Sequence, residues 1–161
     1  MPSRWTFTIP PIAAFIERHL NGAKVIVDPF AGKSKIGTLR NDLAEGGIDA
    51  HEFCEKLLRE NVVADAVLFD PPYSPRQLAE CYKSVGRQVT TMDTQSSALY
   101  ARIRKPLGNL LKPNGIALSF GWNSMGFGKK WQTLEIMLVA HGGGHYDTIC
   151  VAQRKPLDLL P

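Results

Sequence analysis

The stretch ADAVLFDPPY, residues 64–73, predicts a buried strand that ends abruptly in an acid and two prolines. Its apolar residues do not alternate with polar ones, as expected of a strand that is covered on both faces. Pro71 and Pro72 lack a backbone N–H and cannot extend a central strand. The chain therefore leaves the sheet stiffly at Asp70, which directs the Asp70 carboxylate and the Pro71 carbonyl outward.

An earlier stretch, AKVIVDPF at residues 23–30, has the same design and places Asp28 and Pro29 at its end. Apolar spacing and turn residues predict further elements. The predicted strands are 36–43, 116–122, 133–140 and 147–154, and the predicted helices are 10–20, 49–60, 74–86 and 96–111, the last disturbed at Pro106. Strands that alternate with helices and close on a hairpin favour an α/β fold with an open, mostly parallel sheet. Such sheets bind ligands outside the carboxyl ends of their strands, where Asp28 and Asp70 fall.

The first crossover of this sheet is predicted to be unusually short. Only fourteen positions separate Asp28 from Asp42, and Ile36 already belongs to the next predicted strand. A full parallel crossover with its helix needs roughly 10 to 12 residues or more. We therefore expect the first crossover helix to be shortened or missing.

Gly32-Lys33-Ser34 resembles the end of a phosphate-binding loop. Such a loop needs another glycine five positions before Gly32, where this chain has Val27. In addition, Pro29 has no N–H to donate, and Asp28 would repel a phosphate. Spacing and charge therefore argue against a nucleotide-hydrolysing loop.

The two acidic strand ends suit a cationic cofactor and an amine acceptor. Asp28 suits positive charge, Phe30 offers an apolar surface, and Gly32 permits close approach of the backbone. Asp42 follows the second strand, where an acid can accept hydrogen bonds from both hydroxyls of a ribose. At the other strand end, the Asp70 carboxylate and the Pro71 carbonyl are two acceptors for the two N–H donors of a planar amino group. Tyr73 adds a flat face on which a base can stack.

At residues 8 to about 153 the chain resembles the amino-methylating DNA methyltransferases, which modify adenine N6 or cytosine N4. DPPY is similar to their catalytic motif, DPFAG to their S-adenosylmethionine motif, and TIPPIAAFIERHL to their N-terminal cofactor motif. The resemblance implies a Rossmann-like sheet of class I methyltransferases with a C-terminal antiparallel hairpin. It implies catalytic roles for Asp70, Pro71, Pro72 and Tyr73. It implies S-adenosylmethionine binding by Thr8, Ile9, Pro10, Asp28, Pro29, Phe30, Gly32, Asp42, Asp49 and Ala50.

The predicted activity is methyl transfer from S-adenosylmethionine to the exocyclic amine of a DNA base, with adenine N6 preferred. Lys33, Arg76, Trp122, Asn123, Lys129 and Lys130 are the candidate nucleic-acid contacts. Residues 1–161 would form one catalytic domain without a separate target-recognition domain. Loops, a partner subunit or a homodimer would then supply target recognition.

Two alternatives stay open from the sequence. An RNA base methyltransferase acting on a guanine or adenine amino group could use the same motifs. A cofactor-binding but inactive subunit of a nucleic-acid-modifying complex is the other, because Lys33 and Ser34 stand where the family usually continues with glycine.

Composition adds little to the choice of function. The net charge of +4 and the pI near 9.1 favour a polyanionic partner only slightly. Cys54, Cys81 and Cys150 are scattered, which indicates reduced thiols in a cytoplasmic protein and no zinc site. His141 and His145 lack an obvious third metal ligand, so no metal is expected. No window is long and apolar enough to suggest a membrane span.

Overall fold

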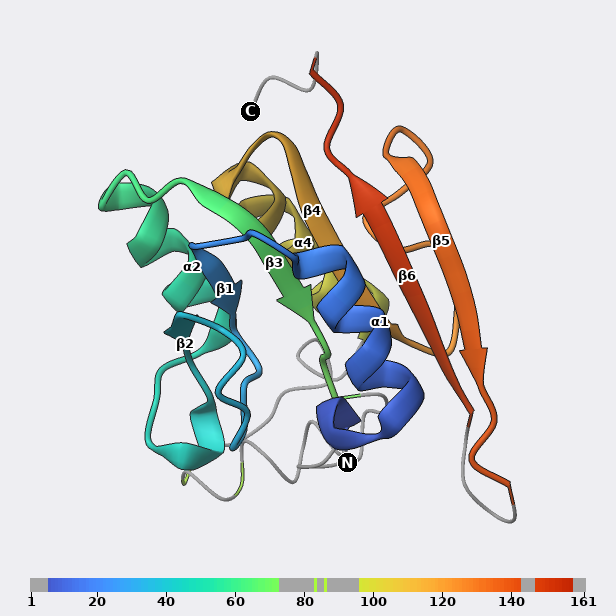
Figure 1. Ribbon diagram of the computed structural model, residues 1–161. Helices are drawn as coiled ribbons and strands as arrows, with labels where there is room; N and C mark the ends of the chain where they lie inside the picture. The colour runs from blue at the N-terminus through green and yellow to red at the C-terminus, as the bar shows by residue number, and fades with distance from the viewer. Residues whose placement is uncertain (1–5, 73–82, 84–85, 87–95, 143–146, 158–161) are drawn as a thin grey trace.

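One mixed sheet organises the computed structural model, which describes residues 6–72, 83, 86, 96–142 and 147–157 (Figure 1). The described strands are ordered β2-β1-β3-β4-β6-β5. Their bounds are Ile26–Asp28 (β1), Leu39–Arg40 (β2), Ala64–Phe69 (β3), Leu111–Gly121 (β4), Gln132–Val139 (β5) and Thr148–Arg154 (β6). The helices are Thr6–Thr8 (η1), Pro10–Leu20 (α1), Leu43–Glu45 (η2), Ala50–Arg59 (α2) and Ser96–Leu110 (α4).

The pairing pattern confirms the predicted open, mostly parallel sheet. Strands β2, β1, β3 and β4 pair in parallel, and β6 runs antiparallel between β4 and β5. The β5–β6 hairpin is also confirmed, with Val139 opposite Thr148 at its closed end.

The connection from β1 to β2 contains no helix, as its length predicted. Residues 29–38 form turns and irregular chain, and Val27 then pairs with Leu39 in parallel. This connection folds back over the end of β1. A Cβ atom on Gly37 would lie 2.7 Å from the Cβ of Asp28, so only glycine allows the chain to pass here.

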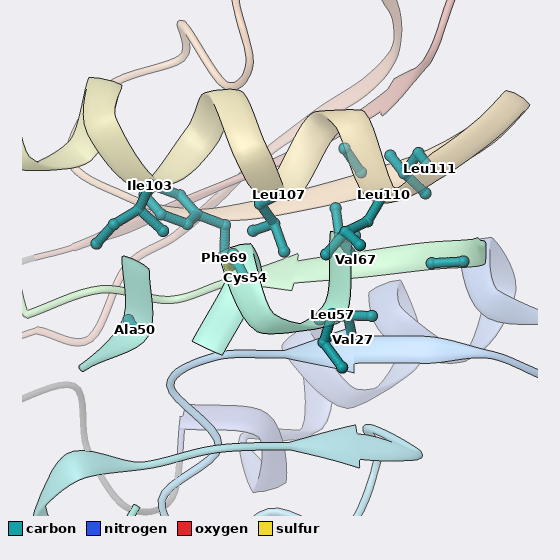
Figure 2. Close-up of a cluster of buried hydrophobic side chains, with 12 residues drawn as sticks. Val27, Ala50, Cys54, Leu57, Val67, Phe69, Ile103, Leu107, Leu110 and Leu111 are labelled. Atoms are coloured by element: carbon teal, nitrogen blue, oxygen red, sulfur yellow. The ribbon is translucent and has the colours of Figure 1, made fainter. Parts of the chain in front are cut away.

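Helices cover both faces of the sheet. Helix α1 lies on one face, and α2 and α4 lie on the other (Figure 1). Strand β3 shows why both faces can be covered, since Ala66 and Leu68 pack toward α1 while Val67 and Phe69 pack toward α2 and α4. Figure 2 shows the second of these clusters, in which side chains of α2 and α4 meet those of β1 and β3. A strand that is buried on both faces needs apolar residues at consecutive positions, which explains why the apolar residues of β3 do not alternate with polar ones.

Helix α4 corrects one detail of the sequence prediction. We expected a disturbance at Pro106, but the helix runs from Ser96 to Leu110 with Pro106 inside it. Proline removes one helical hydrogen bond, and burial of Ile103, Leu107 and Leu110 on the inner face offsets that cost.

Two other segments differ from their predicted form or lie largely outside the described residues. The predicted turn at 112–115 lies within the bounds of β4 as an irregularity, where these four residues of β4 stand against the single Asp65 of β3 and Asn114 has a positive φ. The predicted helix at 74–86 lies outside the described residues except for Lys83 and Gly86.

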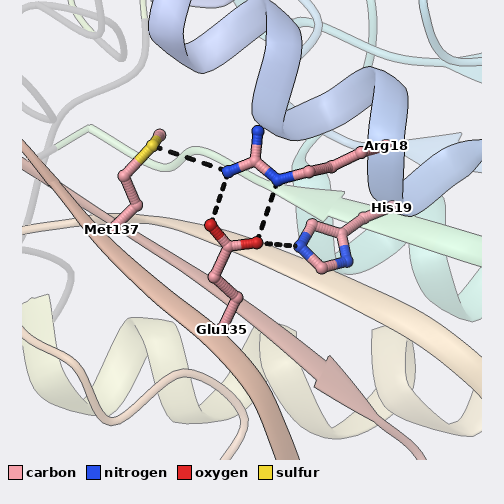
Figure 3. Close-up of polar contacts among 4 residues, drawn as sticks. All are labelled: Arg18, His19, Glu135 and Met137. Carbon is pink, nitrogen blue, oxygen red and sulfur yellow. Dashed lines mark hydrogen bonds and ion pairs between the residues drawn. The ribbon is translucent and has the colours of Figure 1, made fainter.

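An ion-pair cluster joins α1 to strand β5 (Figure 3). The Nε of Arg18 donates to Oε2 of Glu135 over 3.0 Å, and the Nε2 of His19 lies 2.7 Å from the same oxygen. Hydrogen bonding to Arg18 is the main reason why the pKa of Glu135 is lowered to about 2. The cluster thereby anchors the β5–β6 hairpin to helix α1.

Candidate active site

The carboxyl ends of β1 and β3 bring Asp28 and Asp70 to the same edge of the sheet. Val27 pairs with Val67, so Asp28 is level with Leu68, and Asp70 lies two positions beyond it. Asp28 is fully buried and Asp70 nearly so. Two acids that are forty-two positions apart in the chain thus become neighbours because parallel strands end at one edge.

Asp28 is held in an environment that disfavours its charge. Its Oδ1 accepts a hydrogen bond from the Phe30 N–H (3.1 Å), whereas its buried Oδ2 has no hydrogen-bond partner among the described residues. Burial raises the pKa of Asp28 to about 8, and the nearby carboxylates of Asp70 and Asp42 add to the increase. An Asp28 carboxyl of this kind takes up a proton near neutral pH unless a donor or cation reaches Oδ2.

The loop after β2 is tied to the end of β1 by hydrogen bonds. Asp42 accepts from the Gly32 N–H through Oδ2 and from the Ala44 N–H through Oδ1, both over 2.9 Å. Asn41 is buried, and its side chain both donates to and accepts from the backbone of Ile48. These contacts bring the predicted cofactor residues Gly32 and Asp42 together, and Asn41 is a positioning residue that the sequence did not reveal.

Asp49 and Ala50 lie at the start of α2 and have structural contacts of their own. The Oδ1 of Asp49 accepts hydrogen bonds from the backbone N–H groups of His51 and Glu52, which makes Asp49 the N-cap of the helix. Ala50 is buried in the core beneath α2. Any contact of these two residues with a cofactor would come in addition to these local roles.

The remaining predicted cofactor residues are divided between two places. Pro29 is buried, and Phe30 packs edge-on against Phe69 with 5.8 Å between ring centroids. Thr8, Ile9 and Pro10 lie where η1 leads into α1, and the Phe7 ring next to them packs 4.9 Å from the Phe120 ring of β4. The N-terminal segment is thereby placed over the end of β4, on the opposite side of β3 from the β1–β2 loop.

A small pocket of about 40 Å³ opens beside Pro71. The predicted substrate residues Trp122 and Asn123, which follow β4, line it together with Pro71. Trp122 is half-exposed. The structure therefore brings the carboxyl end of β3 and the loop after β4 to the same pocket. The sequence predicted that they would lie close together because each directly follows a strand.

Helix α4 contributes two residues to this pocket that sequence reasoning missed, Tyr100 and Arg104. The Tyr100 hydroxyl donates a hydrogen bond to the Pro72 carbonyl, and burial raises the pKa of Tyr100 to about 12. The Nη1 of Arg104 donates to the Gly126 carbonyl over 2.6 Å. One side of the helix carries Tyr100, Ile103, Arg104 and Leu107. The helical spacing of Tyr100 and Arg104 with two apolar residues was therefore the sequence signal that could have revealed them.

Ser119 on β4 is the fourth missed residue. It is paired with Phe69 across the sheet and lines the same pocket as Pro71. Its hydroxyl is buried and has no hydrogen-bond partner among the described residues.

Several predicted residues lie elsewhere or cannot be placed. Lys33 is exposed on the β1–β2 loop, and Lys129 and Lys130 are exposed just before β5; none of the three lines the pocket beside Pro71. Tyr73 and Arg76 lie outside the described residues, as do Cys81 and His145.

Other chemistries find no support in the described part of the chain. Within it, no group of three or more His, Cys, Asp or Glu side chains could hold a metal ion. Cys54 and Cys150 are buried free thiols, and burial raises the pKa of each to about 12, so neither is an activated nucleophile. None of the described helices combines the length and apolar character that a membrane crossing requires.

Comparison with known proteins establishes the fold class. No protein-family model and no curated protein matches the sequence. Among solved structures the chain is similar to SMU.776, which is assigned to the methyltransferases and was solved in complex with SAH, with a TM-score of 0.54 and 13% identity over 82% of this chain and 45% of that one. It is also similar to a methyltransferase from Pyrococcus furiosus, with a TM-score of 0.52 and 12% identity over 92% of this chain and 83% of that one.

At these identities the similarity defines the fold and no more. The sheet is the Rossmann-like sheet of class I methyltransferases, with the first crossover helix missing. The chain spans less than half the length of SMU.776, so that protein's complete architecture does not carry over.

Proposed function

We propose that this protein transfers a methyl group from S-adenosylmethionine to the exocyclic amine of a nucleic-acid base, with adenine N6 in DNA as the preferred acceptor. One observation carries the proposal: Asp70 and Pro71 leave the carboxyl end of β3 beside a pocket that Trp122 and Asn123 also line. The methyltransferase fold and the SAH complex of SMU.776 support the choice of cofactor.

The residues around β1 fit such a cofactor by their chemistry. The buried Oδ2 of Asp28 has no hydrogen-bond partner in the described part of the chain, so it needs a donor or a positive charge, and a sulfonium or ammonium group would supply one. Asp42 would accept hydrogen bonds from ribose hydroxyls with lone pairs that Gly32 and Ala44 leave available. Thr8, Ile9 and Pro10 would contact the methionine part, and Asp49 and Ala50 the adenine side. Phe30 would add apolar contact.

In this proposal the acceptor amine is oriented by the end of β3. Bound S-adenosylmethionine supplies an electrophilic methyl group on a sulfonium, whose sulfur keeps the bonding electron pair when the methyl leaves. The Asp70 carboxylate and the Pro71 carbonyl accept one N–H hydrogen bond each, which favours the tetrahedral nitrogen of the transition state. The nitrogen lone pair forms the new N–C bond, and the N–H proton held at Asp70 is then released to solvent.

Other residues position the base and the chain around it. Tyr73 would stack on the base, Pro72 stiffens the segment, and the Tyr100 hydroxyl fixes the Pro72 carbonyl. A base in a duplex would first have to be flipped out of the helix, at a cost of a few kcal/mol. Lys33, Arg76, Lys129 and Lys130 would neutralise backbone phosphates. A partner subunit or a second copy would complete target recognition.

A second candidate is an inactive cofactor-binding subunit. The observation that favours it is the closure of Gly37 over Asp28, together with the use of the Asp42 and Asp49 carboxylates in local hydrogen bonds. Methyl transfer separates the two candidates, because a cofactor-binding but inactive subunit would bind S-adenosylmethionine in calorimetry and yet transfer no methyl group.

The experiment that tests the proposal is incorporation of labelled methyl groups from S-adenosylmethionine into DNA and into RNA of matched sequence. We expect incorporation into DNA by the wild type and a loss of at least about a hundredfold in Asp70→Asn, since the substitution keeps the shape of the side chain and removes the negative charge that accepts the transition-state hydrogen bond. Equal incorporation by both proteins would refute the role of Asp70, and incorporation into RNA alone would reassign the substrate.

A further inference from the structure

A second hollow lies between α4 and residues 122–131, the loop that joins β4 to β5. Its volume is about 410 Å³, roughly ten times that of the pocket beside Pro71. Of the described residues that line the two spaces, only Arg104 is common to both. The hollow, which we call the α4 groove, therefore begins where the pocket ends.

The α4 groove has an aromatic wall. The rings of Phe127 and Trp131 pack with 4.9 Å between their centroids, and both line the groove. On the helix side stands Gly108, where a Cβ would lie only 3.1 Å from Cζ2 of Trp131. A glycine in a helix interior is less stable than an alanine. At this position the glycine allows the indole to lie directly against α4.

The charge of the α4 groove is of one sign. Arg104, Lys105 and Lys155 line it, and no Asp or Glu among the described residues does. Lys129 and Lys130 are exposed on the adjoining loop. Lys155 is buried, and its Nζ donates to the carbonyls of Gly108 and Leu111 over 3.0 and 2.7 Å, so its charge is fixed at one end of the groove.

Arg104 fixes the other end. Its Nη1 donates to the Gly126 carbonyl, and its guanidinium lies 5.9 Å from the centroid of the Phe69 ring. Phe69 immediately precedes Asp70, so Arg104 connects the groove to the candidate acceptor site. Lys105, by contrast, is exposed and can meet a ligand in solvent.

We propose that the α4 groove binds unpaired nucleotides that flank the target base. A cationic groove with aromatic side chains is what single-stranded nucleic acid needs, since phosphates meet the cations and bases stack on the rings. Bases in a duplex are already stacked on one another, so the rings of Phe127 and Trp131 favour an unpaired segment, whose bases are free to stack on them. Continuity through Arg104 lets one strand occupy both the groove and the pocket. The inference rests on the proposed function for the target base, whereas binding in the groove does not require methyl transfer.

Charge-reversal variants test the electrostatic part of this inference. Binding of a fluorescent single-stranded oligonucleotide, as DNA and as RNA of the same sequence, is followed by anisotropy at several salt concentrations. Lys105→Glu and Lys130→Glu should each weaken binding about tenfold and lower the salt slope by about one or more. Lys24→Glu makes the same change of net charge on an exposed lysine before β1 and should have less than about a twofold effect. Equal effects at Lys24 and Lys105 would overturn the inference.

An aromatic variant tests the stacking part. Trp131→Leu keeps apolar bulk and should weaken oligonucleotide binding by about tenfold or more, because a stacked base contributes roughly 1–3 kcal/mol. Polyglutamate of comparable charge serves as a competitor that cannot stack. If polyglutamate displaces the oligonucleotide as well as unlabelled oligonucleotide does, the α4 groove is a general polyanion surface and the inference fails. Should Trp131→Leu not fold, the Lys105→Glu result and this competition still decide the matter.

The test of the α4 groove can fail or succeed independently of the test of methyl transfer. Lys105→Glu should weaken oligonucleotide binding by the same factor in an Asp70→Asn background as in the wild type, because Asp70 does not line the α4 groove. Groove-dependent binding without methyl transfer would support the groove and refute the enzyme. Methyl transfer that is unaffected by Lys105→Glu and Lys130→Glu, with oligonucleotide affinity also unchanged, would refute the groove and leave the enzyme standing.

Discussion

The Tyr100 hydroxyl on α4 donates a hydrogen bond to the carbonyl of Pro72, so the helix that covers β3 also holds the segment that leaves it. Pro72 has no N–H and cannot donate a strand-pairing hydrogen bond. A side chain from a neighbouring helix therefore performs the positioning that strand pairing cannot, and it does so two residues after the candidate catalytic acid.

Tyr100→Phe should lower kcat about tenfold and leave the KM for S-adenosylmethionine unchanged. The lost hydrogen bond contributes on the order of 1 kcal/mol, and the variant loosens the acceptor side without touching the β1 side. Steady-state kinetics with saturating DNA measure the effect. A rise in the cofactor KM with constant kcat would show that Tyr100 acts on a different part of the site.

Gly37→Ala should destabilise the fold by about 1–3 kcal/mol, because a methyl group at this position overpacks against the Asp28 side chain. Urea unfolding measures the loss. Gly22→Ala is the control, since Gly22 has a φ of +82° but no atom within 4 Å of its added Cβ, and it reports backbone strain alone. A smaller loss for Gly37→Ala than for Gly22→Ala would show that the loop does not close on Asp28.

The stability of the protein should fall as pH rises from about 4 to about 8. The pKa of Asp28 is raised from 3.8 to about 8 in the folded chain, so in this window the folded state binds a proton that the unfolded state releases. Stability then declines with pH by an amount on the order of a few kcal/mol. Asp28→Asn should remove most of this decline. Chemical unfolding at pH 5 and pH 8 measures the free energy of unfolding of both proteins. An equal change between the two pH values in the wild type and in Asp28→Asn would contradict the raised pKa of Asp28.

Glu135 should act in the opposite direction and at lower pH. Its pKa falls from 4.5 to about 2 on folding, mainly through Arg18, so its contribution is complete above pH 4.5 and is lost as pH falls toward 2. Glu135→Gln should therefore show a shallower loss of thermal stability between pH 4.5 and pH 2 than the wild type. Identical acid profiles would mean that the cluster in Figure 3 does not hold α1 to β5 in solution.

The sequence predicted the sheet well because burial on both faces leaves a local signature. Val67 and Phe69 face one set of helices, and Ala66 and Leu68 face another, so β3 had to be apolar throughout. The missing crossover helix was equally predictable, since the chain between Asp28 and Asp42 is too short to hold one.

The position of a candidate site residue was predictable only where that residue lies at the end of a strand. Asp28 and Asp70 follow directly from their strands, whereas Tyr100, Arg104 and Asn41 act through contacts between elements far apart in sequence. The close approach of Gly37 to the Asp28 side chain could not be predicted either, because a glycine in a loop does not indicate which residue the backbone approaches.

The most direct test of the account is mass spectrometry of the nucleosides from DNA that has been incubated with the protein and S-adenosylmethionine. We expect N6-methyldeoxyadenosine with the wild type and a background level with Asp70→Asn, which differs at the one carboxylate assigned to the amine. A methylated nucleoside carrying its new group on carbon, or equal amounts of methylated amine from both proteins, would contradict the central claim that Asp70 orients an exocyclic amine for methyl transfer.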